Sequence, residues 1–333
     1  MPEKKLITKI DMNKKHILIT GGAGYIGSHV NKMLNSAGYK TIVLDNLCTG
    51  DRQAVTQGHF IEGDIRDLSL LDRLFTEHSI SAVMHFAAST DVGESVVNPL
   101  KYYRNNVGGA LNLVDAMCRH QIKNLVFSSS AAIFGIPKEL SVNETHPCHP
   151  INPYGESKLM VEKILQDLDC TNAIKFCCLR YFNAAGGDPE GKLKNYKHKE
   201  TNLIPIILKN LQVERDVTIF GTDYLTPDGT CVRDYVHIED LGAAHIMAME
   251  QLLAGGASTS YNLGNGQGFS VRQVIAAVQE VTGKPIHIIE GGRREGDPPF
   301  LVANAQKAKN ELGWQPQYPT LQAMIAHAWK AMI

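Results

Sequence analysis

The chain lacks both a long apolar run and an excess of charge of either sign. No apolar stretch approaches the roughly 18 to 20 residues that a membrane-spanning helix needs, and no apolar signal core follows the first five residues. The 33 Lys and Arg residues balance 34 Asp and Glu residues, for a formal net charge of -1. Such a chain has no general basic field to attract nucleic acid or anionic lipid. We therefore expect a cytoplasmic protein with no nucleic-acid partner and no membrane partner.

Cysteine is scarce and forms no recognisable framework. The seven cysteines are odd in number and contain no C-x-x-C pair, so neither a disulfide network nor a metal site is indicated. Hydrophobic residues make up 44% of the 333 residues and charged residues 20%, a composition typical of a packed globular protein with about two domains. The thiols that we expect to be free are those of Cys48, Cys118, Cys148, Cys170, Cys177, Cys178 and Cys231.

Strand-like and helix-like segments alternate in the first half of the chain. Residues 1–13 have no apolar period, and we expect this leader to be poorly ordered. A β-branched run over His16–Thr20, a helical pattern over Tyr25–Ala37 and an apolar run over Lys40–Leu44 then predict a βαβ unit. Further strands are expected over His59–Ile61, Ala82–Phe86, Asn124–Ser128 and Phe176–Tyr181, and further helices over Leu68–His78, Pro99–His120 and Gly155–Leu168. This alternation predicts an α/β fold with a doubly wound parallel sheet.

The alternation becomes irregular after about residue 183, which suggests a second, smaller domain. Glycines and a run of lysines predict a loop over Ala184–Thr201, and short helices and strands are mixed beyond it. We therefore assign residues 14–183 to the first domain and residues 184–333 to a smaller domain of mixed α/β type. A helical stretch over Ile238–Leu253 and the strand-like segment Tyr261–Gly264, together about residues 238–264, could return to the first sheet.

A glycine turn lies between the first strand and the first helix. In the segment T-G-G-A-G-Y-I-G, Gly21, Gly24 and Gly27 permit a tight turn, close approach of a pyrophosphate and close packing of helix on strand. The positive end of the helix dipole then faces the phosphates. Asp45 ends the second strand 18 residues beyond Gly27, where a carboxylate can accept from a ribose 2′-hydroxyl and repel a 2′-phosphate. The pattern predicts a Rossmann-type domain that binds NAD rather than NADP.

A tyrosine and a lysine follow at the spacing of one helical turn. Tyr154 and Lys158 lie at i and i+4, so their side chains share one helix face. A nearby ammonium group and a positively charged nicotinamide would both stabilise a phenolate, which lowers the pKa of the phenol from its usual value of about 10. Ser130 ends an earlier strand of the same sheet and could bind the oxygen from which the tyrosine takes a proton. The pair alone is a common surface pattern, and its place beside the nucleotide turn favours catalysis.

Two groups of motifs, spread over about residues 14–333, carry a family resemblance. The first group is Thr20–Gly27, Asp45-Asn46, Asp64-Ile65, His85–Ala87, Val92–Ser95, Asn105-Asn106, Ser128–Ser130, Tyr154–Lys158 and Leu179–Asn183. This group resembles the extended short-chain dehydrogenase/reductase family. The second group is Asn202–Pro205, Ile219–Tyr224, Asp228–Tyr235 and Arg293–Asp297. It narrows the resemblance to the UDP-glucose 4-epimerase family.

That resemblance implies an isomerase that interconverts UDP-galactose and UDP-glucose with NAD as cofactor. Tyr154 would act as the base, Ser130 as its proton-relay partner, and Lys158 would lower the tyrosine pKa. The larger domain would hold NAD through Gly21, Gly24, Tyr25, Ile26, Gly27, Asp45, Asn46, Thr49, Gly50, Asp64, Ile65, Phe86, Ala87, Asn105, Ser128, Tyr154, Lys158, Tyr181 and Phe182. The resemblance also implies a homodimer, paired through the Pro99–His120 helix and the helix that bears Tyr154.

The smaller domain would bind the UDP-sugar. By resemblance, Arg233 and Arg294 pair with the diphosphate, Asp297 holds a ribose hydroxyl and Phe220 lies against uracil, in keeping with the bidentate geometry of guanidinium groups. The implied substrate-binding set is Ser130, Tyr154, Asn183, Asn202, Leu203, Thr218, Phe220, Arg233, Arg294, Asp297 and Leu301. A plainer interpretation of Arg233 is a surface ion pair with the adjacent Asp234.

Four features depart from the family pattern or vary within it. Thr90 stands where many relatives have a lysine, and Phe134 replaces a common tyrosine. The Lys-rich segment after Gly191 is expected to be a solvated cover for the substrate cleft. Leu301 is smaller than an aromatic side chain and larger than Ser or Cys, so we expect a preference for UDP-galactose with weak turnover of the N-acetylated sugar.

Three alternatives stay open at this point. The substrate could be another nucleotide sugar, such as UDP-N-acetylglucosamine or a UDP-pentose. A 4,6-dehydratase would need an acid and a base where this chain has Ala131-Ala132. A non-catalytic NAD-binding sensor is disfavoured because Ser130, Tyr154 and Lys158 are all present.

Overall fold

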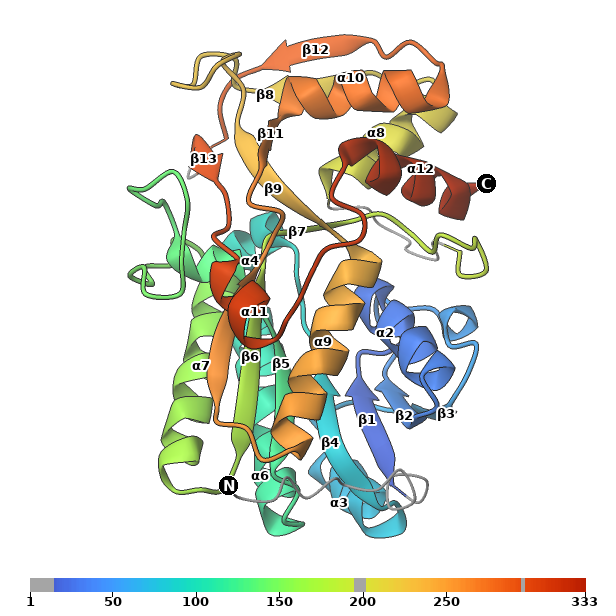
Figure 1. Cartoon of the computed structure of the whole chain (residues 1–333), viewed down its shortest axis with the longest axis vertical. Coiled ribbons are helices and arrows are strands. Elements are labelled where there is room, and N and C mark those ends of the chain that lie inside the picture. Colours follow the sequence, from blue (N-terminus) through green and yellow to red (C-terminus); the bar gives the residue numbers. More distant parts are fainter. Residues whose placement is uncertain (1–14, 195–201, 295–296) are drawn as a thin grey trace.

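The molecule has a larger part built on a parallel sheet and a smaller part beyond the carboxyl ends of that sheet (Figure 1). The computed structural model describes residues 15–194, 202–294 and 297–333. The predicted leader lies outside these ranges, and so does the end of the Lys-rich segment. Within the described ranges, no helix combines the length and the apolar character needed to span a membrane.

Seven strands form the main sheet in the order β10-β6-β5-β4-β1-β2-β3, and all neighbouring pairs are parallel. The strands are β1 (His16–Thr20), β2 (Lys40–Asp45), β3 (His59–Glu62), β4 (Ile80–His85), β5 (Asn124–Ser130), β6 (Lys175–Tyr181) and β10 (Thr259–Leu263). The strand order reverses between β1 and β4, where a doubly wound sheet leaves a crevice at its carboxyl edge. The predicted fold class is confirmed, and β10 brings a segment from late in the chain onto the edge of this sheet.

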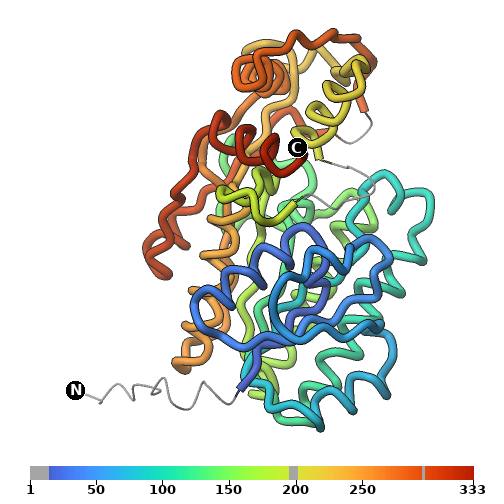
Figure 2. Tube along the Cα trace, turned by 90° about the vertical axis from the view of Figure 1, so that its right-hand side faces the viewer, coloured from blue at the N-terminus to red at the C-terminus, as the bar shows by residue number. Residues whose placement is uncertain are grey.

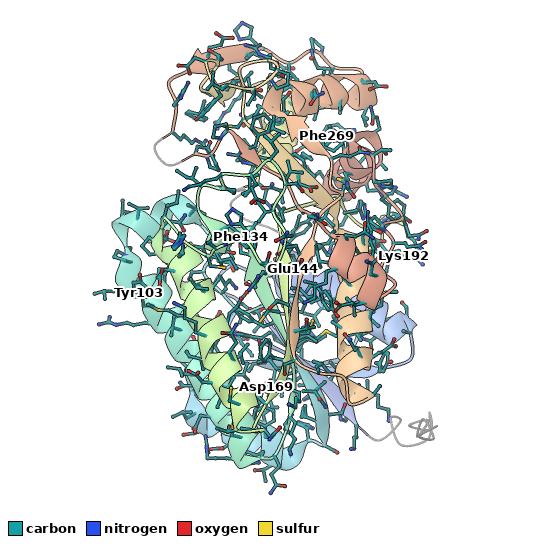
Figure 3. The ribbon with its side chains drawn as sticks, turned by 60° about the vertical axis from the view of Figure 1, so that its left-hand side comes forward. Tyr103, Phe134, Glu144, Asp169, Lys192 and Phe269 are labelled. Atoms are coloured by element: carbon teal, nitrogen blue, oxygen red, sulfur yellow. The ribbon has the colours of Figure 1, made fainter. Side chains whose placement is uncertain are left out.

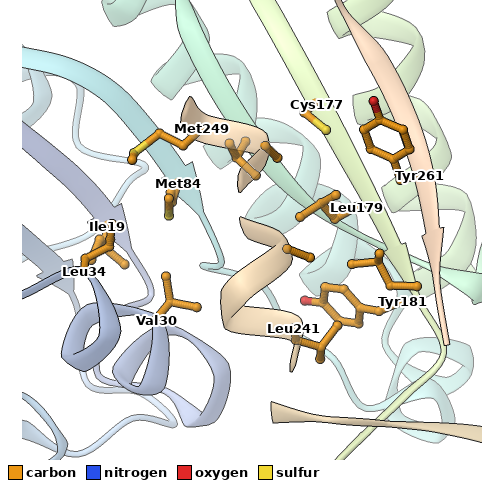
Figure 4. Packing of buried hydrophobic residues seen from close by; sticks show 14 of the residues in the cluster. Ile19, Val30, Leu34, Met84, Cys177, Leu179, Tyr181, Leu241, Met249 and Tyr261 are labelled. Carbon is orange, nitrogen blue, oxygen red and sulfur yellow. The ribbon is translucent and has the colours of Figure 1, made fainter. Parts of the chain in front are cut away.

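Helices cover both faces of the sheet because successive strand residues point to opposite sides. Ile17 and Ile19 belong to one apolar cluster, whereas Leu18 belongs to another. The first cluster packs against α2 (Tyr25–Ser36) and α9 (Ile238–Leu253), with Leu241 and Tyr261 among its members (Figure 4). The second packs against α3 (Leu68–Glu77), α6 (Gly109–Arg119) and α7 (Pro153–Cys170).

The helix expected over Pro99–His120 is present, but it is not a regular α-helix throughout. It consists of α5 (Pro99–Tyr102), a π-helical segment η2 (Tyr103–Gly108) and α6. Apolar spacing cannot distinguish these forms, since a π-segment adds a residue to a turn without ending the helix. Short helices flank the neighbouring loops: η1 (Arg52–Ala54), α4 (Val92–Val97) and η3 (Ala131–Phe134).

The smaller part contains two short sheets and their covering helices. In one, β9 (Val232–His237) pairs with β7 (Asn183–Ala185), β11 (Gly268–Ser270) and β13 (Phe300–Leu301). The other joins β8 (Val217–Phe220) to β12 (Ile288–Gly291). The helices are α8 (Leu203–Gln212), α10 (Val271–Thr282) and α12 (Leu321–Met332), whereas α11 (Gln306–Glu311) packs beside β10 at the edge of the main sheet (Figure 1). The expected loop therefore begins with a strand, because residues 183–185 pair with β9.

The smaller part stays connected to the larger one through β9, which runs directly into α9. The turned view shows the helices of the smaller part gathered above the sheet domain (Figure 2). Residues from both parts therefore meet at the carboxyl edge of the main sheet, where the sequence places the cofactor and the reacting sugar.

Candidate active site

The glycine turn has the shape that the sequence predicts. Gly21 has a φ of 74°, and a Cβ added there would lie 2.5 Å from the backbone nitrogen of Ala87. A Cβ on Gly27 would lie 2.4 Å from the carbonyl oxygen of Gly21. Among the described residues, no side chain caps α2 at Gly24, so the first N–H groups of that helix remain donors for an anionic group. These features fit the pyrophosphate of a dinucleotide.

Asp45 lies beside this turn and has a second, structural task. Its Oδ2 accepts a hydrogen bond from the Ala23 N–H at 2.9 Å, and its Oδ1 accepts from the Leu47 N–H at 2.9 Å. Burial raises the pKa of Asp45, while these two backbone donors oppose the shift. The carboxylate therefore fixes the conformation of the turn. Its hydrogen bond to a ribose hydroxyl stays a prediction.

The other predicted cofactor residues surround the same edge. A pocket at the turn is lined by Gly24, Tyr25, Thr49 and Gly50 among others. Asn46 donates to Asp64 at 2.7 Å, and the Arg66 guanidinium holds the pKa of Asp64 well below its usual range. The remaining residues of the set are buried or half-buried around these strand ends: Ile26, Ile65, Phe86, Ala87, Ser128, Tyr181 and Phe182.

The start of α7 positions Tyr154. Asn152 caps the helix by accepting from the Gly155 N–H at 2.9 Å, and Pro153 occupies the first turn. A Cβ on Gly155 would lie 2.5 Å from the carbonyl oxygen of Ala132, so this turn packs closely on η3. The phenol consequently lies near Ser130, whose hydroxyl influences its pKa.

Lys158 lies one turn further along α7 and faces the end of β5. Its ammonium group donates to the Ser128 carbonyl oxygen at 2.8 Å and lies 5.9 Å from the centre of the Tyr154 ring. It also lies 4.9 Å from the centre of the Phe127 ring. The structure therefore brings together all three residues predicted for the chemistry.

Burial shifts the pKa values of this pair in opposite directions. It raises the pKa of Tyr154, and the nearby Ser130 hydroxyl opposes that shift. Burial also lowers the pKa of Lys158 to about 7, with Glu162 as the first opposing charge. Lys158 is not among the groups that shift the pKa of Tyr154 here, and the lowering expected with NAD bound stays a prediction.

Asn106 lies beside the predicted Asn105 and connects two neighbouring segments. Its side chain accepts from the Ser89 N–H at 2.8 Å and donates to the Ser157 Oγ at 3.0 Å. Asn106 is buried, whereas Asn105 is half-buried and donates to it at 3.1 Å. Helical spacing alone could not distinguish the two asparagines, because a π-segment changes which residues of the helix point inward.

Arg233 and Asp297 form an ion pair on the substrate side. The plainer interpretation of Arg233 as the partner of Asp234 is wrong, because Asp234 is buried and accepts instead from backbone N–H groups at residues 265, 266 and 303. The guanidinium of Arg294 lies 3.8 Å from the centre of the Phe220 ring. Residues expected at the diphosphate, ribose and uracil thus gather in two contacting pairs.

The other predicted substrate residues connect these pairs to the catalytic groups. Leu301 pairs with Arg233 across β13 and β9, and it packs on a cluster that contains Ala131 and Phe182. Asn183 donates to the Asp234 carbonyl oxygen at 2.8 Å. Asn202 precedes α8, Leu203 begins that helix, and Thr218 lies in β8.

No cluster of side chains in the described ranges could hold a metal ion, and all seven cysteines are free. The candidate site is therefore defined by a nucleotide-binding turn, a serine-tyrosine-lysine group and a set of guanidinium and carboxylate side chains.

Comparison with known proteins identifies relatives of this arrangement. The model of the NAD dependent epimerase/dehydratase family matches residues 17–264. A UDP-glucose 4-epimerase of Halalkalibacterium halodurans is 50% identical over 314 residues, which are 94% of each chain. The UDP-glucose 4-epimerase of Brucella ovis, in complex with NAD, is 43% identical with a TM-score of 0.92, over 95% of this chain and 97% of that chain.

A third relative was solved with both kinds of ligand. The UDP-glucose 4-epimerase of Bifidobacterium longum, in complex with NAD+ and UDP, is 37% identical with a TM-score of 0.90, over 95% of this chain and 98% of that chain. The predicted resemblance is confirmed: the chain belongs to the NAD-dependent epimerase/dehydratase family, among its UDP-glucose 4-epimerases.

Proposed function

We propose that this protein interconverts UDP-galactose and UDP-glucose by transient oxidation at C4 of the sugar. The observation that carries the proposal is the gathering of Ser130 with Tyr154 and Lys158, which lie one turn apart on α7, at the same sheet edge as the glycine turn. When bound, NAD+ supplies the hydride acceptor for C4 and the donor that returns it. An epimerisation with no net redox change needs this arrangement in one site.

Each of the three side chains has a separate task. Tyr154 takes the proton of the 4-hydroxyl, and Ser130 binds the same oxygen and relays the proton. Lys158 provides a positive charge that stabilises the phenolate, provided that its ammonium form persists in the buried site. Its hydrogen bond to Ser128 keeps the ammonium group at the end of β5.

The cofactor would be held by the predicted NAD set. The uncapped start of α2 would bind the pyrophosphate, and Asp45 would accept from a ribose hydroxyl. The uracil, ribose and diphosphate of the substrate would be bound by Phe220, Asp297, and the two arginines 233 and 294.

The test is incubation of the purified protein with UDP-galactose, without added NAD, followed by separation of the product nucleotide sugars. We expect UDP-glucose to form. Parallel incubation with UDP-N-acetylgalactosamine tests the alternative substrate, and release of a 4-keto-6-deoxy sugar would instead indicate a dehydratase. A protein that binds NAD but converts none of these sugars would be a sensor, and the proposal would be wrong.

The proposal includes a cytoplasmic location and a homodimeric state. A homodimer would cover an exposed apolar stripe on α4, α5 and α6, beside the helix that bears Tyr154. The stripe comprises Val96, Val97, Leu100 and Leu111, of which Val97 is 81% exposed. Burying such a stripe against its copy would remove apolar surface from water. Measuring the solution mass at micromolar concentration tests this, and a strictly monomeric mass would refute it.

A further inference from the structure

Glu162 lies on the same face of α7 as the two catalytic side chains of that helix. Tyr154, Lys158 and Glu162 follow one another at intervals of four residues, so their side chains form a row along the helix. Only 1% of the Glu162 side chain is exposed. The carboxylate lies behind Lys158 as seen from Tyr154, so it does not belong to the group that would touch a substrate.

Three elements hold the Glu162 carboxylate. The Arg180 guanidinium of β6 donates to Oε2 through Nη2 at 2.6 Å and to Oε1 through Nε at 3.0 Å. Ser129 Oγ of β5 donates to Oε1 at 2.5 Å. Arg180 also donates to the carbonyl oxygen of Glu144 at 3.3 Å, in the loop that lies near Phe134 at the middle of the molecule (Figure 3). A bidentate pair of this depth fixes the position of the carboxylate.

Several other titratable groups face this row, and burial keeps each of them uncharged at neutral pH. Burial and then the Lys158 charge lower the pKa of His85 on β4 to about 3. Burial raises the pKa of the Cys178 thiol on β6 well above its usual value and raises that of Cys148 as well. Burial likewise raises the pKa of Tyr181, which is hydrogen-bonded to Ser128.

The charge balance around Lys158 therefore depends on few groups. Burial is the largest influence on its pKa and lowers it, while Glu162 is the first group that raises it. Cys178 is the next group that raises it, although burial keeps that thiol uncharged at neutral pH. Of the described side chains that face Lys158, Glu162 is thus the one that supplies negative charge.

We propose that Glu162 is a positioning residue for the reaction, which acts through Lys158: its buried carboxylate, fixed by Arg180 and Ser129, favours the ammonium form of Lys158 beside Tyr154. This inference rests on the proposed function for the role of Lys158 in turnover. It assigns a functional task to an ion pair that would otherwise be a structural contact between α7 and β6.

The test compares the pH dependence of kcat in Glu162→Gln with that of the wild type. Glutamine keeps the size and an acceptor for Ser129 but removes the charge, so Lys158 should lose its proton at a lower pH. Since the ammonium form is required, the alkaline limb of the profile should move toward acid by about one unit. A merely structural role would lower kcat at every pH or lower the melting temperature, and would leave that limb in place.

Two variants serve as controls for this comparison. Ser129→Ala removes a hydrogen bond to the same carboxylate without changing any charge, and the alkaline limb should stay where it is in the wild type. The double variant Glu162→Gln with Arg180→Met removes both buried charges, which avoids an unpaired guanidinium if the single variant fails to fold. Because the loss of the Arg180 charge offsets part of the effect, the double variant should shift the limb in the same direction as Glu162→Gln but by less. An unmoved limb in a folded Glu162→Gln or double variant would overturn the proposal.

A second measurement separates this inference from the proposed function. The titration of Lys158 can be followed by NMR in holoenzyme with isotope-labelled lysine, its signal being identified by loss in Lys158→Met. Glu162→Gln should shift that titration toward acid whether or not UDP-galactose is turned over. A shifted titration with no epimerase activity would refute the function alone, whereas an unshifted titration in an active enzyme would refute the task of Glu162 alone.

Discussion

The cofactor side and the substrate side of the site hold their polar groups in different ways. On the cofactor side the protein backbone is the main partner. The ammonium group of Lys158 donates to a carbonyl oxygen of β5, and Asp45 accepts from two backbone N–H groups. Both side chains are buried, with exposed fractions of 3% and 9% for the two residues. These groups have few alternative positions.

On the substrate side, charged and aromatic side chains hold one another. Arg233 pairs with Asp297, and the Arg294 guanidinium lies over the ring of Phe220, which is 39% exposed. Each of these four residues is expected to bind part of the nucleotide. A nucleotide would therefore exchange these internal contacts for its own, at a cost that lowers affinity.

This difference indicates that the proposed catalytic groups and the proposed nucleotide-binding groups differ in how rigidly the protein holds them. The groups proposed to act on the reacting bond are already held by the protein before substrate binds, which favours electrostatic preorganisation. The groups proposed to bind the nucleotide would exchange partners on binding, so their replacement should alter KM more than kcat. The comparison would be wrong if substitutions on the two sides changed kcat and KM in the same way.

The largest expected effect comes from Tyr154→Phe. The substitution removes the proton-transfer group and little volume, so kcat should fall by roughly 10² to 10⁴ while NAD remains bound. Turnover of UDP-galactose and the NAD content of the purified protein provide the two measurements. Tyr39→Phe is the control, because it deletes a hydroxyl that donates to Glu250 at 2.6 Å outside the site. Wild-type kcat in the Tyr154 variant would remove this residue from the mechanism.

The next effect is expected from Arg233→Met. Loss of a charge-assisted contact with the diphosphate is worth about 1.5 to 3 kcal/mol, so KM for UDP-galactose should rise roughly tenfold to a hundredfold. Because the guanidinium is remote from the reacting bond, kcat should change much less. Arg272→Met removes an exposed ion pair with Glu290 and should leave both constants near their wild-type values. A fall in kcat with an unchanged KM would contradict the proposed division between the two sides.

A smaller effect, on thermal stability, is expected from glycine substitutions on the cofactor side and on the substrate side. Gly27→Ala places a Cβ within 2.4 Å of a backbone oxygen, and overpacking of this kind costs about 1 to 3 kcal/mol. Gly292→Ala, on the substrate side, meets nothing within 4 Å. Thermal unfolding should show a melting temperature lower by several degrees for the first variant and nearly unchanged for the second. Equal melting temperatures would mean that the glycine turn is less rigid than its packing indicates.

The sequence predicts the larger part of the fold well because its signals are local. Apolar periodicity and the glycine turn define the first βαβ unit, and the helix predicted over Ile238–Leu253 has the same bounds as α9. The proximity of Ser130, Tyr154 and Lys158 can also be predicted from the sequence. The strand β5 is followed in the chain by the helix α7, and the two elements pack against each other.

Contacts between distant parts of the chain could not be predicted in the same way. The partner of Arg233 lies 64 residues away, and the three backbone donors to Asp234 come from segments brought together only by the smaller part. Glu162 gives no signal beyond helical spacing, because its meaning depends on Arg180 from another strand. The individual roles of the predicted site residues stay predictions until variants are measured.

The smallest expected effect comes from Leu301, which lies where the cofactor side and the substrate side of the site meet. It is half-buried on β13, next to Arg233 in register, and packs on the cluster that contains Ala131 and Phe182. That position places it between the catalytic groups and the nucleotide-binding groups. A bulky side chain there should exclude a large 2-substituent of the sugar, and a small one should admit it.

We expect the wild type to prefer UDP-galactose and to turn over UDP-N-acetylgalactosamine weakly, because an acetamido group left without a hydrogen-bond partner costs about 1 to 3 kcal/mol. Leu301→Tyr should lower the second activity relative to the first, and Leu301→Ser should raise it. Each change in the ratio of kcat/KM should be several-fold, below the full effect of an enclosed pocket, since Leu301 is only half-buried. Phe300→Tyr is the matched control, because adjacent strand residues face opposite sides. Equal rates on both sugars in the wild type, or the same ratio in both Leu301 variants, would show that selection of the 2-substituent lies elsewhere in the site.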